Sequence, residues 1–147
     1  GGSVCPALAV AFGAGCALAM EQGEDEERRQ AGLVRSLVVQ LEAKTAHAVT
    51  VIGPDLPAAP ADGRPWPRLP NMVCVSFRGL SGQELQTKLQ DRVAFSTLNA
   101  DALAGAGLES GLVEGAVQLS VGRESTEEDV TAAADAIAEV ANELWSA

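Results

Sequence analysis

Aromatic side chains are scarce in this chain of 147 residues, which contains two Trp, three Phe and no Tyr. Apolar residues still make up 47% of the sequence, and most of them are Ala, Val and Leu. This length suits one domain with one sizeable core. We therefore predict a single domain over residues 1–147, whose core is built from small and branched side chains.

Positive charge is also scarce, since 10 basic residues face 20 acidic ones and the formal net charge is −10. The only lysines are Lys44 and Lys88, so no basic stripe can form around them. Nucleic-acid binding needs clustered Lys or Arg against phosphates, and an anionic membrane surface needs the same. The charge balance argues against both kinds of partner.

Cysteine and histidine are too few for the sites they usually build. Cys5, Cys16 and Cys74 form no CxxC pair, and His47 is the sole histidine. A disulfide framework needs more cysteines, and structural zinc needs four closely placed ligands. We predict no metal, an inert thiol at Cys74, a surface position for His47 and a reducing intracellular compartment.

One long uncharged stretch, residues 5–20, stands near the start of the chain. It is shorter than the roughly 20 residues that a membrane-spanning helix needs, and no basic segment precedes it as in a signal peptide. We predict a helix from Pro6 to about Glu21, ended by Gly23 and buried on most sides. The alternative is that this helix is the buried face of a contact with something larger.

Hydrophobic periodicity predicts further elements. A second helix begins near Glu24 and has a stripe formed by Leu33, Leu37 and Leu41. β-Branched and apolar runs predict four strands, at 48–52, 72–77, 93–97 and 116–121. A proline-rich stretch at 53–70 and a small-residue stretch at 99–107 read as loops, the second followed by a helical turn.

Two further helices have recognisable starts. Ser81 and Glu84 form a predicted capping box for a helix that ends near Leu89. Residues 125–126 open the last helix, whose buried face is expected to contain Val130, Ala133, Ala134, Ile137, Ala141 and Leu144. Together the elements predict an α+β fold, with a small, mostly antiparallel sheet of about four strands covered on one face by helices.

Known catalytic motifs are missing from the sequence: there is no P-loop, no dinucleotide-binding glycine motif, no nucleophile elbow and no zinc-protease motif. The acidic clusters lie at helix starts, where the helix dipole explains them. One segment stands out, LSVGR, which ends a strand with a glycine and Arg123 before a helix. The guanidinium of Arg123 suits a carboxylate; the alternative is an ion pair with Glu124 or Glu127.

Five segments carry a family resemblance. In chain order they are GGSVCPALAVAFGAG, LPN with the strand MVCVSF, the helix over 79–89, RVAFSTLNAD and AVQLSVGRESTEE. Taken together they resemble the C-terminal small domain of the cysteine desulfurase and selenocysteine lyase family. These are class V aminotransferase-like, fold-type I enzymes that use pyridoxal phosphate.

The resemblance implies that a larger, preceding domain holds pyridoxal phosphate through a lysine. That cofactor domain is absent from these 147 residues, and neither Lys44 nor Lys88 has the family's histidine-lysine context. Ser3 corresponds to the family threonine that reaches the cofactor phosphate, although one residue is missing nearby. We therefore expect no cofactor on this chain alone.

Two positions of the family's active site fall within the chain. Asp101 occupies the place of the nucleophilic cysteine, and the loop after it is shorter than the family's catalytic loop. A carboxylate is a hard oxygen nucleophile that cannot carry a persulfide, so no catalytic residue is expected here. Arg123 corresponds to the arginine that binds the substrate's α-carboxylate.

Three functions are compatible with these features. The first is a non-catalytic small domain that acts as a binding or structural subunit, exposing the apolar helix over 5–20 to a larger protein or a second copy. The alternative is part of a longer or split pyridoxal phosphate enzyme whose lysine lies elsewhere. The third is an independent carboxylate-binding module that uses Arg123.

Overall fold

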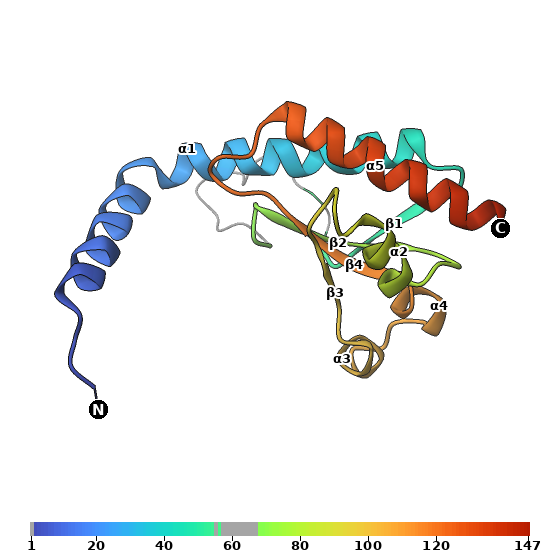
Figure 1. Cartoon of the computed structure of the whole chain (residues 1–147), viewed down its shortest axis with the longest axis horizontal. Coiled ribbons are helices and arrows are strands. Elements are labelled where there is room, and N and C mark those ends of the chain that lie inside the picture. Colours follow the sequence, from blue (N-terminus) through green and yellow to red (C-terminus); the bar gives the residue numbers. More distant parts are fainter. Residues whose placement is uncertain (1, 55, 57–67) are drawn as a thin grey trace.

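The computed structural model describes residues 2–54, 56 and 68–147, and it contains five helices and four strands (Figure 1). Their order is α1 (Pro6–Lys44), β1 (Val49–Ile52), β2 (Met72–Phe77), α2 (Gly82–Leu89), β3 (Ser96–Thr97), α3 (Ala100–Gly105), α4 (Ser110–Val113), β4 (Ala116–Ser120) and α5 (Glu127–Ser146). Most of the predicted loop at 53–70 lies outside the described residues.

The four strands form one sheet in the order β1-β2-β4-β3, and every neighbouring pair is antiparallel. Val75 at the centre of β2 pairs with Val51 on one side and with Val117 on the other. Helices α1 and α5 lie side by side over one face of this sheet (Figure 1). The predicted α+β class, with four strands and a helical layer, is confirmed.

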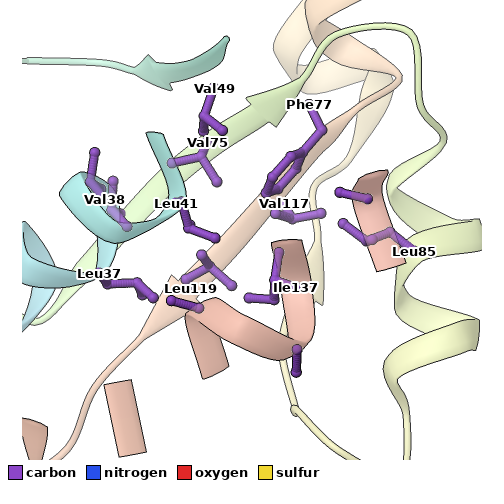
Figure 2. Packing of buried hydrophobic residues seen from close by; sticks show 14 of the residues in the cluster. Leu37, Val38, Leu41, Val49, Val75, Phe77, Leu85, Val117, Leu119 and Ile137 are labelled. Carbon is purple, nitrogen blue, oxygen red and sulfur yellow. The ribbon is translucent and has the colours of Figure 1, made fainter. Parts of the chain in front are cut away.

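The core lies between the sheet and these two helices (Figure 2). Val73, Val75 and Phe77 of β2 are fully buried, because alternate residues of a strand point to the same face. Leu33, Leu37 and Leu41 of α1 belong to the same buried cluster, which confirms the predicted leucine stripe (Figure 2 labels the last two). The predicted face of α5 is also largely buried, and its largest fully buried side chain is Ile137.

Helix α1 is continuous, so the prediction of two helices separated at Gly23 is wrong. A glycine inside an exposed helix costs only about 1 kcal/mol relative to alanine. Ion pairs within the helix offset that cost, since Arg28 contacts Glu24 at 3.4 Å and Arg29 contacts Glu26 at 2.8 Å. The helix bends between its first and second parts in Figure 1.

The first part of α1, residues 6–20, is exposed throughout, which corrects the expectation that it is buried on most sides. Phe12 is 76% exposed and Met20 is 90% exposed. This part, which we call the α1 arm, projects beyond the sheet, while the second part of α1 forms the core (Figure 1). The burial of α1 begins at Ala31.

The segment around β3 also differs from the prediction. The strand expected at 93–97 is reduced to Ser96–Thr97, and the side chain of Gln86 donates to the carbonyl of Phe95 just before it. The predicted loop at 99–107 contains the helix α3, whose first turn is capped by the Asn99 side chain accepting from the amide of Ala102 at 3.1 Å. The predicted helical turn after it is α4.

Helix capping follows the sequence in part. The Ser81 hydroxyl accepts from the amide of Glu84 at 3.4 Å, as the capping box requires, and among the described residues the reciprocal bond is not formed. A full capping box opens α5 instead, where Thr126 and Asp129 each bond the other's backbone amide.

Candidate functional site

The segment between β4 and α5 carries Arg123 and forms a closed turn. The amide of Ser125 donates to the carbonyl of Gly122 at 3.2 Å, and the amide of Gly122 donates to the Ser125 hydroxyl at 2.9 Å. We call residues 122–125 the Arg123 turn. It is followed directly by the capping box of α5, so its C-terminal end is fixed to a helix.

A second arginine, Arg29 of α1, bonds the backbone of this turn. Its guanidinium donates to the carbonyl of Ser125 at 2.7 Å, to that of Arg123 at 2.8 Å and to that of Gly122 at 3.0 Å. Arg29 therefore satisfies three carbonyls of one turn with a single planar group.

Glu26 holds Arg29 from the other side. Its two carboxylate oxygens accept from Arg29 at 2.9 and 2.8 Å, and Gln30 donates to it at 2.7 Å. The bond from Arg29 lowers the pKa of Glu26 from 4.5 to about 2, with a smaller contribution from Gln30. The same bond raises the pKa of Arg29. This bidentate arrangement fixes the plane of the Arg29 guanidinium.

The side chain of Arg123 is exposed and donates to the amide oxygen of Gln22 at 2.8 Å. This contact replaces the ion pair with Glu124 or Glu127 that was the alternative interpretation. Gln22 and Glu26 are four residues apart on α1, so they lie on the same face of the helix. Among the described residues, the bonded partner of Arg123 is this neutral amide, and the charge of Arg123 also helps to lower the pKa of Glu26.

Asp101 lies at the other end of the sheet. Thr97 of β3 pairs with Val117 near the start of β4, and the chain then leads to α3, where Asp101 stands exposed in the first turn. Arg123 follows the opposite end of β4. Figure 1 shows α3 well separated from the segment that joins β4 to α5. The structure thus does not bring Asp101 and Arg123 together.

Ser3 is also remote from both residues. It is exposed and precedes the α1 arm, whose outer end leads to the N-terminus in Figure 1. The three positions singled out by the family resemblance therefore occupy three separate places, and Arg123 is the one whose side chain bonds another part of the chain, at Gln22.

The two lysines do not fit pyridoxal phosphate, which needs an amine in a pocket. Lys44 is bound to Asp135 at 2.6 Å and donates to Gln40 at 2.9 Å. Lys88 is exposed in the last turn of α2. Neither lines any of the three hollows described below.

Three hollows meet at Val93 and Ala94. The most enclosed, between this segment and α5, has a volume of about 110 Å³, and the two open ones have about 310 and 550 Å³. The enclosed one is small beside the roughly 300–1,000 Å³ of typical ligand pockets. Apolar side chains dominate the walls of the enclosed hollow, whereas the open ones also present polar groups, those of Gln86 and Gln90 in one and those of Arg92 and Asp129 in the other.

The remaining candidate residues have structural surroundings. All three cysteines are free, and burial raises the pKa of the half-buried Cys74, which suits the inert thiol that was predicted. His47 is exposed, as predicted, and its ring lies 4.8 Å from that of Trp145.

Within residues 2–54, 56 and 68–147, no acidic, His or Cys cluster could hold a metal ion. No helix in the described part of the chain is long and apolar enough to span a membrane.

Glu26 and Arg29 were missed by the sequence analysis. Their spacing of three residues on a helix was visible, and such a pair normally indicates a local surface ion pair. Nothing in the sequence links that pair to a turn 93 residues further along, which the bond between Arg29 and Gly122 reveals.

The comparisons with known proteins concern the fold. No protein-family model matches the chain, and no curated protein sequence does. Among solved structures, a NifS-like protein from Rickettsia africae is similar with a TM-score of 0.74, at 18% identity over 95% of this chain. A second structure described as a NifS-like protein has a TM-score of 0.62, at 24% identity over 88% of this chain.

In both cases the similarity covers a minor part of the other protein, 36% of the first chain and 30% of the second. The present chain thus spans about a third of the length of these proteins. At this level of identity the likeness establishes a shared fold: these 147 residues fold like a portion of NifS-like proteins.

Proposed function

We propose that this chain is the carboxylate-binding part of a NifS-like pyridoxal phosphate enzyme, and that a separate body supplies the cofactor and its lysine. Arg123 binds the α-carboxylate of an amino acid in this proposal, and the α1 arm docks on the other body. The single observation that carries the proposal is an exposed arginine, held on a braced turn, in a chain that folds like part of NifS-like proteins.

The surroundings of Arg123 support this assignment. Its guanidinium is exposed and its bonded partner Gln22 is a neutral amide. A carboxylate would accept two parallel N–H bonds from an arginine fork, which is stronger than one bond to an amide. An incoming amino acid can therefore displace Gln22 at this place.

The α1 arm supports docking on a larger body. Its exposed large apolar side chains include Leu8, Val10, Phe12, Leu18 and Met20. A helix that is apolar on all sides is normally buried, and large exposed apolar patches mark interaction sites. The arm and the Arg123 turn are joined by α1, since Gln22 lies two residues beyond Met20.

A reconstituted complex tests the proposal. The chain is co-expressed with the lysine-bearing portion of a NifS-like protein, and the absorbance of bound pyridoxal phosphate is followed during titration with cysteine and alanine. We expect a stable complex in which Arg123→Ala weakens amino-acid binding by at least about tenfold. The matched control is Arg92→Ala, which removes an arginine that pairs with Glu139 at 2.7 Å on another part of the surface.

Two results would overturn this function. One is that no complex forms with a body that holds the cofactor. The other is that Arg123→Ala and Arg92→Ala bind cysteine and alanine equally well.

A second candidate is a non-catalytic subunit of the same kind of assembly. The feature that favours it is Asp101, which by the family resemblance corresponds to the nucleophilic cysteine and which lies at the far end of the β3–β4 pair from Arg123. The same complex distinguishes the two candidates, because a non-catalytic subunit binds the body yet releases no sulfide from cysteine. Sulfide release by the wild-type complex would exclude this second candidate.

A further inference from the structure

We propose that Arg29, fixed by Glu26, is the positioning residue that aims Arg123. This inference rests on the proposed function for the identity of the ligand, a carboxylate, but the positioning itself is a property of this chain. It assigns a role to a pair of residues on α1, one of which bonds the backbone of the Arg123 turn.

The argument starts from the three carbonyls of the Arg123 turn. Those of Gly122, Arg123 and Ser125 all accept from the guanidinium of Arg29, at 2.7–3.0 Å. The carbonyls of Gly122 and Arg123 belong to the two peptide planes on either side of the Arg123 Cα atom, so holding both planes fixes the φ and ψ angles of Arg123 and the direction of its Cα–Cβ bond. The bonds from Arg29 therefore set where the Arg123 side chain leaves the backbone, and the contact with Gln22 holds its end.

Glu26 in turn fixes the side chain of Arg29. Arg29 has a long, flexible side chain that loses conformational entropy when it is held in one rotamer. Both Glu26 oxygens bond it, at 2.8 and 2.9 Å, so that the guanidinium plane is set before it meets the turn. Glu26 lies one helical turn beyond Gln22, the residue that the Arg123 side chain contacts.

The turn depends on this arginine because little else braces it. Within the turn, two bonds join Gly122 and Ser125, at 2.9 and 3.2 Å. Gly122, Arg123 and Glu124 are all exposed, so packing does not hold them. Without Arg29, the carbonyls of Arg123 and Ser125 would turn to water, that of Gly122 would keep only the bond from the Ser125 amide, and the backbone of Arg123 would no longer be held.

The test compares Arg29→Ala with Arg28→Ala in the whole chain. Arg28 is the neighbouring arginine and contacts Glu24 and Asp25 at 3.4 and 3.6 Å, so its removal changes the charge equally without touching the turn. Nuclear magnetic resonance is used to follow the side-chain Nε–H signal of Arg123 and the amide exchange of Gly122 and Ser125. We expect Arg29→Ala to broaden or shift the Arg123 signal and to speed both exchanges at least about tenfold.

Titration with L-alanine adds the functional readout. We expect the wild type and Arg28→Ala to show the same shifts at Arg123, and Arg29→Ala to bind at least about tenfold more weakly. If alanine leaves the wild type and Arg123→Ala equally unchanged, the carboxylate function fails, while the side-chain signal and the exchange rates still decide the positioning role.

The inference is overturned if Arg29→Ala leaves the Arg123 side-chain signal and both exchange rates as they are in Arg28→Ala. Glu26→Gln is the milder variant should Arg29→Ala fail to fold. It keeps the arginine but weakens its fixation, and we expect it to change the same signals in the same direction by a smaller amount. An unchanged Arg123 signal in Glu26→Gln would show that Glu26 does not help to position Arg123.

Discussion

At the scale of single residues, Glu26 gives the protein a predictable response to pH. Its pKa is lowered from 4.5 to about 2 by the bond from Arg29, so the folded state favours the charged carboxylate. The stabilisation is therefore complete above about pH 4.5 and is lost as the pH falls towards 2.

The prediction concerns Glu26→Gln, measured by urea unfolding at several pH values. The variant is expected to be less stable than the wild type at neutral pH, and the difference should shrink as the pH approaches 2. Glu24→Gln is the control, because the contact of that exposed carboxylate with Arg28 is long, at 3.4 Å. A stability difference that stays constant over the whole pH range would show that Glu26 is not coupled to Arg29 in this way.

Gly115 offers a second test at this scale. A Cβ atom placed there would lie 2.2 Å from the carbonyl oxygen of Phe77, a main-chain atom that cannot rotate away. Gly115→Ala should therefore lower the free energy of unfolding by about 1–3 kcal/mol, or prevent folding. The matched control is Gly111→Ala in α4, where a Cβ atom meets nothing within 4 Å. Equal stability of the two variants in urea unfolding would contradict the close approach at Gly115.

The sequence shows Arg123 but not the residues that hold it. A strand that ends in a glycine and an arginine is a local pattern, so Arg123 could be singled out before the structure was known. Arg29 acts on residues more than 90 positions away. Such a contact depends on how α1 crosses the start of α5, which no local pattern encodes.

At the scale of elements, α1 shows how charge patterning can outweigh a helix-breaking residue. Gly23 suggested an end, but the acidic and basic residues after it form pairs three and four positions apart. These pairs stabilise the helical conformation directly after the glycine. The second part of α1 was predicted correctly, because its leucine stripe packs on the sheet.

The start of α5 gives a prediction of its own. The Thr126 hydroxyl accepts from the amide of Asp129 at 3.2 Å and completes a capping box. Thr126→Ala should cost about 1 kcal/mol in the free energy of unfolding, measured with urea. The control is Thr87→Ala, since the Thr87 hydroxyl donates to the carbonyl of Gln83 within α2 and caps nothing. No loss of stability in Thr126→Ala would contradict the cap.

The two parts of α1 should respond differently to substitution. Phe12 in the arm is 76% exposed and Leu37 is 4% exposed. Leu37→Ala is expected to lower the free energy of unfolding by about 2–5 kcal/mol, whereas Phe12→Ala should leave it unchanged. A large destabilisation by Phe12→Ala would mean that the arm packs on the body in solution.

At the scale of the whole molecule, periodicity and strand propensity were sufficient to predict the α+β class. The alternating apolar residues of β2 and the stripes of α1 and α5 are strong local signals. The strand order was not predicted, because β2 lies beside β4 rather than β3 and the pairing of Val75 with Val117 spans many residues. The strand β3 was predicted too long: it pairs with β4 at Ser96 and Thr97, and the residue before them, Phe95, accepts a bond from the Gln86 side chain.

The exposed arm predicts association in solution. The arm exposes Leu8, Val10 and Phe12, and such exposed apolar side chains favour association with another protein surface. We therefore do not expect the chain to behave as a monodisperse monomer without affinity for a hydrophobic dye. Light scattering of the wild type should show association or dye binding, and Phe12→Glu with Leu8→Glu should reduce either. Glu substitutions at these positions that leave both measurements unchanged would place the contact surface elsewhere.

The most direct test uses the purified chain alone, incubated with pyridoxal phosphate and cysteine. With Lys44 bound to Asp135 and Lys88 at the surface, we expect no specific covalent attachment of the cofactor and no release of sulfide. A single lysine stoichiometrically modified by the cofactor, together with sulfide released from cysteine, would show instead that these 147 residues form a complete active site.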